Sequence, residues 1–108
     1  MVNDFKNAQA VGVTSVTTIY TAPAAKTSIL LELDIANTST NVVEASVEIF
    51  DTSASTDAFL VKNAPVPAGG TLQVVAGQKV ILEATDIVKV TATGAVDVVA
   101  AILEDVNS

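Results

Sequence analysis

The sequence predicts an all-β fold, a single antiparallel β-sandwich of about eight strands with either jelly-roll or immunoglobulin-like topology. Three observations predict it. Valine, isoleucine and threonine, which suit pleated strands, are abundant. Apolar and polar residues alternate with a period of about two in several segments. Turn residues separate these segments at near-regular spacing, and no long segment has the helical period with capping residues.

The chain is long enough for one domain preceded by a short arm. It has 108 residues, half of them hydrophobic, and this length is common for a single domain. Residues 1–10 are polar and lack a clear period, so we expect them to be an N-terminal arm that a partner orders. Residues 11–108 are expected to form the sandwich. Phe5 is the candidate anchor of the arm, because buried aromatic residues tend to dominate interfaces.

The clearest alternation occupies residues 29–36 and 43–50, on either side of turn residues centred on Ser39. Folded as an antiparallel hairpin, the two segments pair their apolar residues on one face, and a slip of one residue would separate them. The outer face would carry Glu32, Asp34 and Glu44. The predicted inward set is Ile29, Leu31, Leu33, Ile35, Val43, Ala45, Val47 and Ile49.

The other strands are predicted from shorter patterns. A first strand covers residues 13–21 and ends before Pro23, and a strand with Phe59 and Val61 inward follows the second alternating segment. Two short strands, residues 72–75 and 79–83, flank a loop at Gly77. The last hairpin joins residues 86–93 and 96–104 around Gly94, with Val88, Val90, Val98 and Ala100 on one face.

Composition excludes several classes of function. The net charge is −7, and the five basic residues are all lysines, so the chain is poorly suited to nucleic acid or to an anionic membrane. Without histidine or cysteine, it lacks the usual zinc ligands and imidazole catalysis. We therefore expect no enzyme activity, no cofactor, no nucleic-acid partner and no membrane partner. The N-terminus lacks the apolar run of a signal peptide, so synthesis in the cytoplasm is expected.

Three acidic residues are the metal candidates. Asp34 and Glu44 fall opposite each other in the predicted hairpin, with Glu32 beside them. Paired carboxylates can hold a divalent cation such as Ca²⁺ or perform acid–base chemistry. The alternative is a solvated acidic face, or one that faces a basic partner.

Apolar residues at outward strand positions are the partner-binding candidates. Leu30, Phe50 and Leu60 fall on faces that the alternation assigns outward, where they would cover a second core layer or form an association surface. The core is rich in valine and alanine and poor in aromatic residues. Such a core contributes little burial per residue, which favours self-association.

Three segments carry a resemblance to a known family. They are Ile19-Tyr20-Thr21-Ala22-Pro23-Ala24-Ala25-Lys26, Val66-Pro67-Ala68-Gly69-Gly70-Thr71-Leu72 and Val80-Ile81-Leu82-Glu83-Ala84-Thr85-Asp86. In this order and spacing they resemble small β-sandwich virion proteins of tailed bacteriophages, over residues 13–104. The family pattern has glycine where this chain has Ala25, so the first turn is expected to differ.

The resemblance implies a location in the virion and a structural role. Proteins of this family decorate or cement the head, and related domains occur on tails and necks. The implied function is a capsid decoration protein that binds the major capsid protein or another virion protein, with a homotrimer as the implied oligomer. Two other classes remain open: a carbohydrate-binding sandwich, as on a receptor-binding fibre, and an adaptor that uses its edge strands.

Overall fold

Eight β-strands and no helix make up residues 4–104, the part of the chain that the computed structural model describes. This part therefore contains no helix that could cross a membrane. The strands are β1 (Asp4–Val13), β2 (Thr17–Thr21), β3 (Ser28–Asn37), β4 (Val43–Asp51), β5 (Thr56–Val66), β6 (Thr71–Leu82), β7 (Ile87–Ala92) and β8 (Val96–Glu104).

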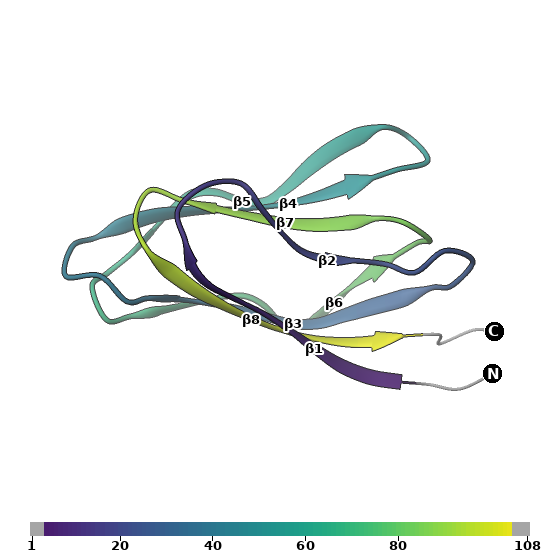
Figure 1. The fold of residues 1–108 in the computed structure, drawn as a ribbon, viewed down its shortest axis with the longest axis horizontal. Helices are drawn as coiled ribbons and strands as arrows, with labels where there is room; N and C mark the ends of the chain where they lie inside the picture. The colour runs from purple at the N-terminus through teal and green to yellow at the C-terminus, as the bar shows by residue number, and fades with distance from the viewer. Residues whose placement is uncertain (1–3, 105–108) are drawn as a thin grey trace.

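The strands form two four-stranded sheets that pack face to face (Figure 1). The first sheet has the order β1-β8-β3-β6 and the second has the order β2-β7-β4-β5, with antiparallel pairing throughout. Only the connection from β4 to β5 stays within one sheet. This arrangement is a jelly roll. The predicted single antiparallel sandwich is confirmed, and its topology is the jelly roll rather than the immunoglobulin-like alternative.

Both predicted hairpins are wrong as pairings. β3 pairs with β6 and β8 in the first sheet, whereas β4 pairs with β5 and β7 in the second. In the same way, β7 and β8 belong to different sheets. The turns around Ser39 and Gly94 are therefore arches across the sandwich. The alternating apolar residues are still buried in this arrangement. Two strands that face each other from opposite sheets both point their apolar side into the core, as two paired strands of one sheet would.

A β-bulge in β3 changes which residues face the core. The register of β3 shifts between Leu30 and Glu32 against both of its neighbours. Leu30 and Leu33 are fully buried, so the two residues between them, Leu31 and Glu32, face outward. The predicted inward set is therefore split: Leu33 and Ile35 lie in the core, whereas Ile29 and Leu31 lie on the outer face.

The core lies between the sheets and is built mainly from valine, leucine and isoleucine. On β4, β7 and β8 the predicted alternation is confirmed, since the predicted inward valines and alanines are buried. Phe59 was predicted inward but is exposed, because β5 shifts register against β4 where Phe59 pairs with Glu48. The largest fully buried side chains include Leu30, Leu33, Ile35, Leu82 and Ile102.

The predicted arm is largely an edge strand. Residues 4–10 belong to β1 and pair in continuous register with β8, from Asp4 opposite Glu104 to Ala10 opposite Val98. Residues 4–10 therefore belong to the sandwich rather than to a separate arm that ends at residue 10. Residues 1–3 lie outside the described part. The sequence signal of residues 4–10 is weak because only Ala8 and Ala10 among them pack on the core, and alanine contributes little hydrophobicity.

Two irregular positions explain other differences from the predicted strands. The two short strands predicted around Gly77 are one strand, β6, from which residues 77–79 bulge, and the Gln78 side chain bonds the backbone of Val74 and Ala76. In the first turn, Ala25 has a φ of 62°. Glycine adopts that conformation at low cost, so the turn keeps a glycine-like geometry with alanine in place.

Candidate functional site

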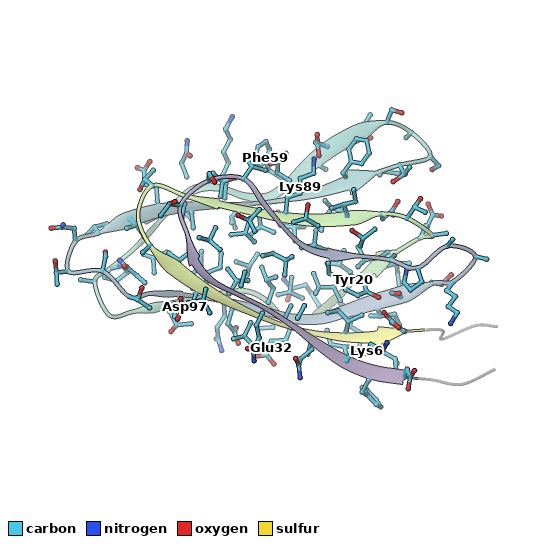
Figure 2. The ribbon with its side chains drawn as sticks, viewed as in Figure 1. Lys6, Tyr20, Glu32, Phe59, Lys89 and Asp97 are labelled. Carbon is cyan, nitrogen blue, oxygen red and sulfur yellow. The ribbon has the colours of Figure 1, made fainter. Side chains whose placement is uncertain are left out.

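The predicted carboxylate group is divided between the two sheets. Glu32 and Asp34 share the outer face of the first sheet, whereas Glu44 is exposed on β4 in the second sheet. Figure 2 shows Glu32 on the outer side of its sheet. The three residues do not form a common metal site, because the hairpin that would have joined them does not exist.

The predicted partner-binding residues have different environments. Phe5 is 76% exposed on the edge strand β1, and Leu60 is 38% exposed on β5. Phe50 is half-buried on the outer face of the second sheet, where the Lys89 ammonium lies 5.0 Å from its ring centroid. Leu30 was predicted outward but is fully buried, because the bulge that follows it reverses the alternation. Phe5, Leu60 and Phe50 therefore reach the surface, and Leu30 belongs to the core.

An acidic cluster that the sequence patterns did not predict lies at one end of the sandwich. Carboxylate oxygens of Asp51, Glu83 and Asp86 lie within 4.8 Å of one another. They line a surface hollow of about 350 Å³ together with Ile49, Thr56, Ala58 and Ile81. Asp51 ends β4, and the other two flank the turn between β6 and β7, so only the strand topology brings them together.

The carboxylates of this cluster organise the surrounding turns. Asp86 is 4% exposed, and its two oxygens accept hydrogen bonds from the backbone N–H groups of Thr52 (3.2 Å) and Glu83 (3.0 Å). Asp51 Oδ1 accepts from the backbone and hydroxyl of Ser53. Hydrogen bonds from backbone N–H groups stabilise an ionised carboxylate, and the carboxylate gives those N–H groups an acceptor. These hydrogen bonds give the cluster a structural role, because they join the loop after β4 to the turn after β6.

A second polar group joins the two sheets beside the start of β1. The Tyr20 hydroxyl on β2 donates a hydrogen bond to the carboxylate of Glu104 on β8 and lies 3.2 Å from the Ser28 hydroxyl on β3. Lys6 on β1 forms an ion pair with Glu104 at 3.3 Å. Figure 2 shows Tyr20 pointing from the second sheet toward the first. Burial, and then the hydrogen bond to Glu104, raise the pKa of Tyr20 to about 12.

This network predicts that Tyr20 ionises at a higher pH than an ordinary tyrosine. Tyr20 is the only tyrosine and there is no tryptophan, so absorbance near 295 nm follows it alone. The folded protein should ionise Tyr20 with a midpoint near 12, compared with about 10 for an unfolded chain. The stabilising contribution is therefore complete below about pH 10 and is lost as pH rises toward 12.

Glu104→Gln serves as the control for this titration. It removes the negative acceptor, so the Tyr20 midpoint should fall toward its ordinary value. Circular dichroism at each pH shows whether the protein is still folded. A midpoint near 10 in the folded wild-type protein would contradict the burial of Tyr20 and its hydrogen bond to Glu104.

The exposed strand faces of the described residues are therefore the main candidate binding surfaces, since the acidic hollow has a structural explanation. No family model matches the chain, and no curated protein is significantly similar to it.

Proposed function

We propose that this protein is a non-enzymatic structural component of a tailed-phage virion, a capsid decoration or cement protein that binds the major capsid protein lattice. The observation that carries the proposal is a jelly roll that leaves large apolar side chains exposed on its strands, among them Phe5, Phe59, Ile81 and Val99. The jelly roll recurs in viral capsid proteins. Exposed apolar residues of this size mark association surfaces when they gather in patches.

Charge and rigidity support the same function. A net charge of −7 keeps the free protein soluble before assembly. Backbone pairing of eight strands in two sheets gives a stiff scaffold that holds its outer faces in fixed shape. A lattice-binding protein needs these properties and no catalytic group. Homotrimer formation remains a prediction that comes only from the family resemblance.

Copy number in purified particles tests this function. Particles of the phage that encodes the chain are purified on density gradients and quantified by mass spectrometry against labelled peptides. A capsid decoration protein should be present in on the order of hundreds of copies, because symmetry repeats its binding site many times, and a tail-tube protein would give a similar number. About a dozen copies or fewer would indicate the neck, baseplate or fibre instead. Absence from particles would contradict the virion function altogether.

The carbohydrate-binding alternative makes a different prediction, because jelly rolls also occur in lectins. A glycan array with the purified protein separates the two. Specific glycan binding together with low copy number would favour a fibre-associated adhesion role. We expect the array to be blank.

A further inference from the structure

The outer face of the first sheet carries a continuous row of apolar side chains, here called the apolar row. Phe5 on β1 is opposite Leu103 on β8, Leu103 is opposite Ile29 on β3, and Ile29 is opposite Ile81 on β6. Their neighbours Leu30, Leu82, Ile102 and Glu104 are buried, so the row faces outward. Phe5 and Ile81 at its two ends are 76% and 58% exposed. The row spans all four strands of the sheet.

Two carboxylates, here called the acidic pair, lie beside the apolar row on the same face. Glu32 is exposed, and Asp34 is half-buried two residues further along β3. Asp34 Oδ1 is buried and accepts no hydrogen bond from residues 4–104. A side-chain hydrogen bond with Asp34, and then the charge of Asp34, raise the pKa of Glu32 above its usual range. The ion pairs within residues 4–104 join Lys6 to Glu104 and Lys89 to Asp57, so neither compensates the acidic pair.

The outer face of the second sheet is different, because its aromatic rings have cationic partners within the chain and one of its carboxylates forms an ion pair. Lys89 pairs with Asp57 at 3.6 Å and also covers the Phe50 ring. Lys62 lies 5.0 Å from the centroid of the Phe59 ring. Such cation–π contacts and ion pairs compensate part of this face within the chain. The first face therefore has the larger unmet demand for an apolar and cationic neighbour.

A second copy of this chain does not meet that demand. Two copies docked through this face would bring together two molecules that each carry a charge of −7, and each copy would add an acidic pair that no ion pair within residues 4–104 compensates. An anionic membrane is repelled for the same reason. A different protein with basic side chains set among apolar ones would complement both features.

The area of the face is sufficient for a specific interface. Four strands about 4.8 Å apart, each about nine residues long at about 3.3 Å per residue, present roughly 550–600 Å² in projection. Side-chain relief increases the accessible area beyond the projection. A standard interface buries about 800 Å² on each partner, so this face alone provides most of one.

We infer that the outer face of the first sheet docks onto a different, basic protein surface, which places apolar side chains on the apolar row and a lysine or arginine on the acidic pair. The inference rests on the proposed function, in which that surface belongs to the capsid lattice. On this inference Glu32 and Asp34 bind a basic side chain of the partner, and they repel each other in the free protein.

The test measures binding of purified variants to phage particles prepared without this protein. Ile81→Ala and Phe5→Ala shorten the side chains at the two ends of the apolar row, and Glu32→Lys reverses a charge of the acidic pair. All three positions are exposed, so folding should survive, which circular dichroism and the melting temperature check. Each variant should weaken binding by about 30-fold or more, the effect typical of an interface hot spot.

Matched controls come from the second sheet. Phe59→Ala and Glu44→Lys make the same kinds of change at exposed positions of that sheet, and should leave particle binding within about twofold of wild type, as for residues outside an interface. Glu32→Gln adds a readout that a purely structural role would not give. It should raise the melting temperature of the free protein, by removing like-charge repulsion, and yet weaken binding to particles.

The outcomes separate the inference from the proposed function. If wild type binds particles and only the second-sheet variants lose affinity, the docking face is wrong and the decoration function stands. If the first-sheet variants change the sedimentation of the free protein instead of its particle affinity, the occupant is a second copy and the inference is overturned. If wild type does not bind particles, the proposed function fails as well.

Discussion

Replacing Leu33 with alanine is expected to lower the free energy of unfolding by about 2–5 kcal/mol, the usual cost of truncating a fully buried leucine. Leu33 is inaccessible to solvent on the inner face of β3, where the two sheets pack. The truncation loses the transfer free energy of the removed groups and leaves a cavity, because neighbouring strands held by backbone pairing relax only partly. Urea unfolding measures it as a lower midpoint with an unchanged slope.

Leu31→Ala is the matched control, because it makes the same chemical change two residues away on the same strand. The bulge turns Leu31 to the outer face, so its truncation should cost less than about 1 kcal/mol, as at most surface positions. Equal losses at both positions would mean that Leu31 also points into the core. That result would contradict the bulge and restore the unbroken alternation that the sequence suggests.

The comparison of these two leucines shows what the sequence could predict. The fold class and most inward positions on β4, β7 and β8 were predictable, because each residue's side of a regular strand follows from a period of two. Strand pairing was not predictable from the same pattern. An apolar face on β3 and one on β4 meet across the core whether the strands are neighbours in one sheet or opposed in two.

Bulges and long-range approach explain the remaining differences. A bulge adds one residue to a strand and leaves no strong mark in composition, so Leu30 and Leu31 exchanged their expected sides. Asp51 and Asp86 meet although 35 positions separate them in the sequence (86 − 51), and no local pattern encodes that meeting. Glu32 and Asp34 were predicted as outward carboxylates, and they remain so because both follow the bulge on the outer face.

Asp86→Ala is expected to destabilise the protein by about 2–4 kcal/mol, since hydrogen bonds to a charged group contribute about 1.5–3 kcal/mol each and are only partly replaced by water. The side chain is almost fully buried and accepts two backbone hydrogen bonds, from Thr52 in the loop after β4 and from Glu83 after β6. Alanine leaves both N–H groups without their acceptor. Thermal and urea unfolding measure the loss.

Two further variants distinguish the loop-holding role of Asp86 from simple charge crowding within its cluster. Asp86→Asn keeps one acceptor oxygen and replaces the other with a donor, so it should lose an intermediate amount of stability. Glu83→Ala removes the exposed member of the cluster and leaves the backbone N–H of residue 83 bonded to Asp86, so stability should be unchanged or should rise slightly as like charges are thinned. If crowding dominated, Asp86→Ala would instead stabilise the protein. If a buried carboxylate joins the two loops, stability should increase from Asp86→Ala to Asp86→Asn to wild type. Glu83→Ala should then be as stable as wild type or more so, and charge crowding alone would not produce this order.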